Sequence, residues 1–211
     1  MSALRNFTLL PHSLPQRFIH PVVLVIARTG ITPNMLTGLG FLGNLGAAVL
    51  VARGEFLIGG LVMLAASALD LLDGALARAT GRVTPFGAVF DSVLDRLSEG
   101  AVLAGLVFYY AALEARQEVG LAFAAAVGSI LVSYVRARAE SQGLDLKEGL
   151  FTRPERVILL ALGLIIDQTR IALWILAVLA NLTVLQRLYV VWRHLGRSTM
   201  EGEAAEASDP S

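Results

Sequence analysis

The sequence predicts an all-α integral membrane protein with six transmembrane helices and an N-terminal cytoplasmic juxtamembrane segment. Apolar residues make up 55% of the 211-residue chain and charged residues only 16%, whereas a soluble domain usually carries about 25% charged residues. The mean hydropathy of +0.67 agrees with a lipid environment. Apolar runs recur along the whole chain and approach the roughly 20 residues that a helix needs to cross a bilayer. Cysteine is absent, which excludes disulfides and thiolate metal sites.

Six apolar segments are interpreted as spans, at about 33–52, 56–79, 85–113, 119–138, 153–166 and 171–192. The first follows Thr32 and begins with Pro33, which is typical of a helix start. The fifth has a short apolar core, and a core helix like those of soluble proteins is the alternative there. An even number of spans places both termini on the same side of the membrane.

The basic residues predict which side that is. The loops opposite the termini carry only Arg53, Arg116 and Arg170, whereas the other basic residues gather on the side of the termini. Because positive charge collects on the cytoplasmic side, the termini and the polar site are expected to face the cytoplasm, in the cell membrane.

Three regions follow from this topology. Residues 1–32 mix apolar and basic residues, and they either lie along the membrane surface or form a poorly ordered lead-in. Residues 33–195 form one six-helix membrane domain. Residues 196–211 form an acidic tail that is predicted to be disordered.

Four aspartates stand at or inside the cytoplasmic ends of the second and third spans. Asp70 and Asp73 are three residues apart, and Asp91 and Asp95 are four apart, so each pair shares one helix face. An ionised side chain at membrane depth is costly and marks a functional site by default. A tight connection over 80–85 brings the two pairs face to face, where four like charges require a cation. Mg²⁺ or Mn²⁺, which prefer oxygen ligands, fit this description.

Small residues accompany the aspartates. Gly74, Ala77 and Gly87 leave room for a bulky polar ligand, although small residues also let membrane helices pack closely. Packing is the favoured interpretation for the four glycines of the first span, Gly38, Gly40, Gly43 and Gly46. Two non-enzymatic alternatives remain for the cluster. One is a cation pathway; the other is a structural salt-bridge network in which the aspartates are neutralised by Arg78, Arg82 and Arg96.

The pattern D-x-x-D-G-x-x-A-R, eight residues, G-x-x-x-D-x-x-x-D runs from Asp70 to Asp95 and resembles the signature of the CDP-alcohol phosphotransferases at every fixed position. The six spans, the cytoplasmic termini and the Thr-Pro-Asn-x-x-Thr run at 32–37 also resemble that family, over about residues 30–195. The resemblance implies a transferase of phospholipid biosynthesis that moves a phosphatidyl group from CDP-diacylglycerol to a small alcohol. It further implies membrane lipid and a second copy of the chain as partners, and no nucleic acid.

The same resemblance implies roles for individual residues. A pair of Mg²⁺ or Mn²⁺ ions would be held by Asp70, Asp73, Asp91 and Asp95, and Asp95 would also act as the general base. The CDP-lipid would be bound by three of these carboxylates (Asp70, Asp73 and Asp91) and by Asn34, Thr37, Gly74, Ala77, Arg78 and Gly87.

A second basic group lies in Ser133-Tyr-Val-Arg136 and in the Arg-Pro-Glu-Arg run from Arg153. Because arginine binds phosphate through two N–H groups, a phosphorylated acceptor is favoured over a neutral or cationic one. The alternative is ordinary cytoplasmic positive charge with local pairs such as Arg136–Glu140. Within the family the arrangement resembles the phosphatidylinositol-phosphate synthases, although arginine at 136 replaces an expected lysine. That resemblance implies inositol phosphate bound by Ser133, Arg136, Arg153 and Arg187; glycerol-3-phosphate is the alternative acceptor and an ether lipid the alternative donor.

Overall fold

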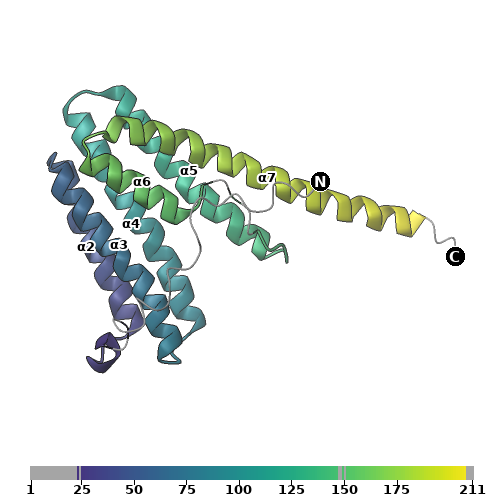
Figure 1. Ribbon diagram of the computed structural model, residues 1–211. Coiled ribbons are helices and arrows are strands. Elements are labelled where there is room, and N and C mark those ends of the chain that lie inside the picture. Colours follow the sequence, from purple (N-terminus) through teal and green to yellow (C-terminus); the bar gives the residue numbers. More distant parts are fainter. Residues whose placement is uncertain (1–22, 24, 147–148, 150, 208–211) are drawn as a thin grey trace.

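The computed structural model describes residues 23, 25–146, 149 and 151–207, with side chains described up to residue 195. Helices form the regular structure of this part of the chain, and no strand occurs in it. The helices shown in Figure 1 are α2 Pro33–Ala52, α3 Phe56–Ala79, α4 Pro85–Ala112, α5 Arg116–Glu140, α6 Arg153–Ile165 and α7 Thr169–Ala207. The all-α prediction is therefore confirmed for the described residues.

Threonines mark three of the helix starts. The hydroxyls of Thr32 and Thr84 each accept a hydrogen bond from the backbone N–H three residues on, at 3.3 and 3.0 Å, and each precedes a proline in the first helical turn. Thr152 begins α6 with a capping box, in which Glu155 accepts from the backbone N–H of Thr152 at 2.5 Å. These caps satisfy N–H groups that a helix cannot pair internally.

Helices α2, α3 and α4 pack together, α6 lies against α3, and α5 packs on α4 and α7. In Figure 1 the first three run side by side, while α5 and α7 diverge from them. Contact between α2 and α4 is close, because a Cβ built on Gly105 would lie 2.5 Å from the carbonyl oxygen of Ala48. Small residues therefore let these helices approach backbone to backbone.

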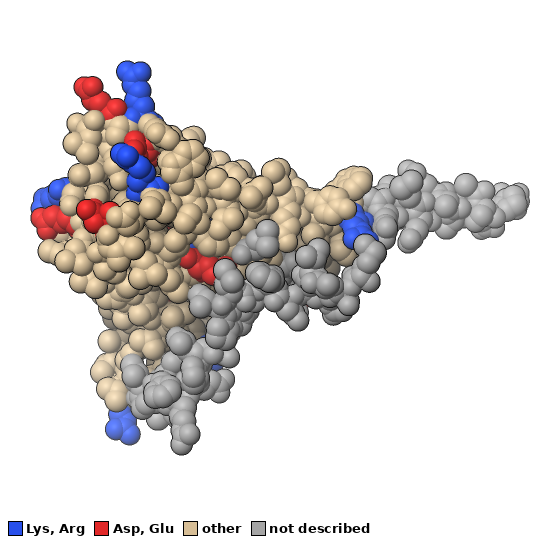
Figure 2. All heavy atoms as spheres, turned by 45° about the horizontal axis from the view of Figure 1, so that its top comes forward, with Lys and Arg blue, Asp and Glu red and all other residues tan. Residues whose placement is uncertain are grey.

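Four helices among the described residues are long and apolar enough to cross a membrane, each with a mean hydropathy of 1.8. They are α2, α3, α5 (as Arg116–Ser141) and the first part of α7 (Thr169–Leu195). Large apolar side chains point outward, including Leu42, Phe108 and Phe123, which are 61%, 70% and 66% exposed. Figure 2 shows a broad uncharged surface between groups of charged side chains. Apolar surface on this scale fits contact with lipid.

Helices α4 and α6 do not meet the same measure. The first 15 residues of α4 include Asp91, Asp95, Arg96 and Glu99. Helix α6 has 13 residues and is roughly 20 Å long, against about 30 Å for the hydrocarbon layer. Four of the six predicted spans are thus supported by length and composition, and the count of six stays a prediction.

Helix α7 continues to Ala207, whereas the sequence favoured disorder from residue 196. The physical reason is composition: glutamate and alanine are good helix formers, and no proline occurs in this segment before Pro210. Residues 1–22 and 24 lie outside the described part, so the predicted juxtamembrane lead-in is not tested there. Residues 25–28 are helical, and Val23 is buried beside Leu36 and Leu76.

Candidate active site

The four aspartates come from α3 and α4, which both pack on α2, and the first residue of α6 joins them. Nη2 of Arg153 lies 2.8 Å from Oδ2 of Asp70 and 2.7 Å from Oδ1 of Asp95. Carboxylates from two helices therefore meet at one guanidinium. The sequence placed Arg153 among acceptor-binding residues, and the structure sets it directly between two predicted metal ligands.

Helix α2 orients a third carboxylate. The hydroxyl of Thr37 donates a hydrogen bond of 2.5 Å to Oδ2 of Asp73, and both side chains are almost fully buried. A buried carboxylate is costly unless it is hydrogen-bonded, so Thr37 both compensates Asp73 and fixes its direction. The resemblance implied that Thr37 lies near the nucleotide, and the structure adds this contact to the carboxylate.

Gly40 makes room for Asp70. A Cβ built on Gly40 would lie 2.5 Å from Oδ1 of Asp70 and 3.1 Å from the carbonyl oxygen of Ala66. The sequence favours helix packing for Gly40, which agrees with its close approach to the Ala66 carbonyl, and the structure adds its place against a site carboxylate. The available signal was its position one helical turn after Thr37, which puts the two residues on one face of α2.

A cavity of about 290 Å³ opens beside the aspartates, between the start of α2, the end of α3 and the start of α4. Its lining includes eight residues that the sequence predicted for the CDP-lipid: Asn34, Thr37, Asp73, Gly74, Ala77, Arg78, Gly87 and Asp91. It also includes five that were not predicted to bind: Pro33, Arg82, Val83, Thr84 and Ala88. The last four could have been suspected, since they lie between or beside the two halves of the motif.

Gly87 keeps the cavity open. A Cβ on this residue would lie 2.9 Å from the hydroxyl oxygen of Thr84 and 3.2 Å from Oδ1 of Asn34. Any larger residue here would press on Asn34, which lines the same cavity. At Gly74 an added Cβ would meet only the flexible end of Arg78, at 3.4 Å. The structure therefore supports a space-making role for Gly87 more strongly than for Gly74.

The donor chemistry fits a hard divalent cation, because carboxylate oxygens from two helices surround one region. Oδ1 of Asp95 is buried and, despite its ion pair with Arg153, accepts no hydrogen bond from the described residues. In the described part of the chain, however, no three carboxylate or imidazole groups converge in metal-binding geometry. The residues fit Mg²⁺ or Mn²⁺ by donor type, while their present arrangement is an ion-pair network.

The partners in that network differ from those considered in the sequence. Arg153, rather than Arg78, Arg82 or Arg96, makes the ion pairs recorded with Asp70 and Asp95. Arg96 instead donates to the backbone carbonyl and the hydroxyl of Ser92 on its own helix.

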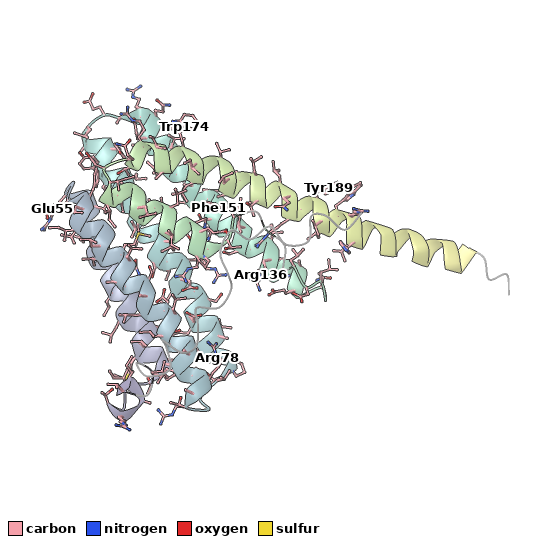
Figure 3. All side chains as sticks on the ribbon, viewed as in Figure 1. Glu55, Arg78, Arg136, Phe151, Trp174 and Tyr189 are labelled. Carbon is pink, nitrogen blue, oxygen red and sulfur yellow. The ribbon has the colours of Figure 1, made fainter. Side chains whose placement is uncertain are left out.

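The remaining acceptor candidates lie on α5 and α7. Arg136 pairs with Glu140 at 2.8 Å on the surface, as the alternative interpretation expected. Ser133 donates to the carbonyl of Ser129 at 3.3 Å on the same helix. Figure 3 shows Arg78 and Arg136 toward the ends of α3 and α5 that point away from Glu55.

Arg187 of α7 is buried and donates to the carbonyl oxygen of Val132 at 2.6 Å. A Cβ on Gly149 would lie 2.7 Å from Nη2 of Arg187, so this guanidinium lies under the segment that leads into α6. Its charge also interacts with those of Arg136 and Arg156. Positive charge from α5, α6 and α7 is thus grouped around Arg187.

Comparison with known proteins shows the family of this chain. The family model described as CDP-alcohol phosphatidyltransferase matches residues 30–194. A phosphatidylinositol phosphate synthase of Mycobacterium marinum is 35% identical over 204 residues, which cover 92% of this chain and 87% of that protein. An archaetidylinositol phosphate synthase of Pyrococcus horikoshii is 37% identical over 171 residues, covering 81% of this chain and 88% of the relative.

Solved structures give the same result. The crystal structure of Mycobacterium tuberculosis phosphatidylinositol phosphate synthase with CDP-DAG bound matches with a TM-score of 0.78 and 35% identity, covering 83% of this chain and 94% of that one. The same enzyme in complex with manganese and citrate also matches with a TM-score of 0.78, covering 82% and 88% of the two chains.

Proposed function

The chain belongs to the CDP-alcohol phosphatidyltransferase family of enzymes, and we propose that it transfers the phosphatidyl group of CDP-diacylglycerol to inositol phosphate. The names of its relatives support this acceptor. Release of CMP and formation of phosphatidylinositol phosphate complete the reaction.

The observation that carries the acceptor assignment is the place of Arg153 beside Asp95. Their side chains approach to 2.7 Å, so a guanidinium suited to phosphate and a carboxylate suited to a hydroxyl proton stand together. An acceptor that carries both a phosphate and a hydroxyl uses both groups. Arg187, Arg136 and Ser133 would complete the phosphate site from α7 and α5. A neutral alcohol would offer no phosphate for Arg153 to bind.

The donor is assigned to the cavity between α2, α3 and α4. Arg78 and Arg82 line it and supply positive charge for the pyrophosphate, while Asn34 offers an amide to the nucleotide. Thr37 holds Asp73 at the cavity wall through its 2.5 Å hydrogen bond. The crystal structure of the tuberculosis relative with CDP-DAG bound supports this donor.

The chemical step is a single displacement at phosphorus. The acceptor hydroxyl oxygen forms a bond to the phosphatidyl phosphorus, the bond from that phosphorus to the CMP oxygen breaks, and the hydroxyl proton passes to Asp95. Asp70, Asp73, Asp91 and Asp95 would hold a pair of divalent ions, and the manganese complex of the relative supports such a cofactor. When bound, the ions neutralise charge on the pyrophosphate and on the departing CMP.

We propose that all six helices cross the membrane and that the starts of α4 and α6 lie in its cytoplasmic half. The termini and the site would then lie on the cytoplasmic side. Arginine predominance at the site end supports this orientation. A homodimer is proposed for the working enzyme.

The test is CMP release by the purified protein in detergent with CDP-diacylglycerol and Mg²⁺. Inositol phosphate, glycerol-3-phosphate, inositol and serine are compared as acceptors, and CDP-archaeol is tried as the donor. Stimulation by inositol phosphate alone supports the proposal. Stimulation by glycerol-3-phosphate instead reassigns Arg153 to a different phosphorylated acceptor, and CMP release without any phosphorylated acceptor contradicts the assignment.

A further inference from the structure

A second ion pair lies one helical turn from the aspartates and has no part in the chemistry described above. Nε of Arg156 donates to Oε1 of Glu99 at 2.7 Å, and Nη2 donates to Oε2 at 2.9 Å. The two side chains are 2% and 4% exposed. This is the two-pronged geometry that fixes both distance and orientation between an arginine and a carboxylate.

The pair is the centre of a network that joins three helices. Ser129 of α5 donates to Oε1 of Glu99 at 2.8 Å, and Nη1 of Arg156 reaches the carbonyl oxygen of Phe151 at 3.4 Å. A buried ion pair is weak evidence for stability, because desolvation of the charges offsets their attraction and apolar residues often pack as well. Its value is better sought in the geometry that it imposes.

The sequence spacing shows which geometry that is. Glu99 follows Asp95 by four residues on α4, and Arg156 follows Arg153 by three on α6. Each pair of positions shares a helix face. The Glu99–Arg156 contact therefore fixes the axial position and the rotation of α6 relative to α4. It does so one helical turn from the point where Arg153 meets Asp95.

We propose that Glu99 and Arg156 are positioning residues that set the place of Arg153 beside Asp95 and thereby the affinity for the acceptor phosphate. Nε of Arg153 is buried and has no hydrogen-bond partner among the described residues. It is a donor available to an anionic oxygen, and its direction depends on how α6 is held. The inference rests on the proposed function for the identity of the acceptor.

The first experiment compares Glu99→Gln with a matched control, Glu118→Gln. Glu118 is equally buried and pairs with Arg170 at 2.6 Å, but it lies at the start of α5, the opposite end of that helix from Arg136. We expect Glu99→Gln to raise the KM for inositol phosphate roughly tenfold or more, with the KM for CDP-diacylglycerol changed less than about twofold. The control is expected to lower Tm and leave both KM values unchanged. A Glu99→Gln enzyme that loses Tm but keeps the acceptor KM overturns the proposal.

A double-mutant cycle then tests the route through Arg153. In an Arg153→Lys background, Glu99→Gln is expected to add little to the acceptor KM, because the group that it positions has already been altered. An equal increase in both backgrounds contradicts the proposal. Ser129→Ala, which removes one hydrogen bond to Glu99, is a milder variant with a smaller expected shift in the same direction, and it serves if Glu99→Gln does not fold.

The outcome can be separated from that of the proposed function. If inositol phosphate fails to stimulate the wild-type enzyme while another phosphorylated acceptor succeeds, the acceptor is reassigned and the same cycle is run with that compound. Calorimetric titration of inorganic phosphate into the full-length protein gives a readout without turnover. Equal phosphate affinity in the wild type and in Glu99→Gln would also overturn the positioning role.

Discussion

Gly40→Ala is expected to impair catalysis far more than stability. The new Cβ would lie 2.5 Å from Oδ1 of Asp70, about an ångström inside ordinary van der Waals contact. That oxygen ends a side chain that can rotate, so the helices need move only a few tenths of an ångström to relieve the 3.1 Å approach to the Ala66 carbonyl. A misplacement of about 1 Å at a catalytic group can cost roughly 100-fold in rate. We therefore expect kcat to fall by about that factor.

The assay is CMP release together with thermal unfolding in the same detergent. Gly38→Ala and Gly46→Ala are matched controls on the same helix, because a Cβ at either position meets nothing within 4 Å. Both controls should keep wild-type kcat and show equal or slightly higher Tm, since alanine favours helix over glycine. The reasoning would be refuted by a Gly40→Ala enzyme with unchanged kcat, or by one whose loss of activity follows only from a collapse in Tm.

Three further predictions concern the carboxylates. Asp95→Asn should abolish most CMP release, by roughly 100-fold or more, while leaving the folded protein in place; substantial activity would remove Asp95 from the role of base. Thr37→Val leaves an oxygen of Asp73 without its hydrogen bond, at a cost of about 1–3 kcal/mol. If the transition state loses the same free energy, kcat/KM should fall roughly 5- to 150-fold. An unchanged kcat/KM would show that this hydroxyl is dispensable. Excess chelator should stop CMP release and added Mg²⁺ or Mn²⁺ should restore it; turnover that persists with chelator would contradict a divalent-metal mechanism.

Local signals predict the helix boundaries well where the chain itself supplies the cap. Helices α2 and α3 have the predicted limits, and α4 ends one residue early, because Thr-Pro starts and glycine breaks act within a few residues of one another. The start of α5 was set at 119 and lies at Arg116. The predicted span leaves out the charged residues Arg116 and Glu118, whereas in the structure Glu118 lies in the first turn of α5 and pairs with Arg170 of α7. That partner is distant in sequence and cannot be read from the segment itself.

In the site, too, some features follow from local sequence spacing and others depend on contacts between distant segments. The spacing of the aspartates on two consecutive helices is enough to predict that they face one region, because the periodicity of the helix fixes their common face. The meeting of Arg153 with Asp70 joins residues that are 83 positions apart, and it depends on how α6 packs. Glu99 was missed although a signal existed: it is a carboxylate inside an apolar segment, one turn after Asp95.

The short helix α6 brings compensating positive charge to the carboxylates of the site. Its last turns pack on Gly60, where an added Cβ would lie 2.8 Å from Cγ1 of Ile165, while its first residue meets Asp70. Helix α6 therefore contacts α3 through both of its own ends, at Gly60 and at Asp70. The positive end of its dipole and the charge of Arg153 are directed at the same carboxylates. A helix extended upstream of Arg153 would move the positive end of its dipole away from these carboxylates.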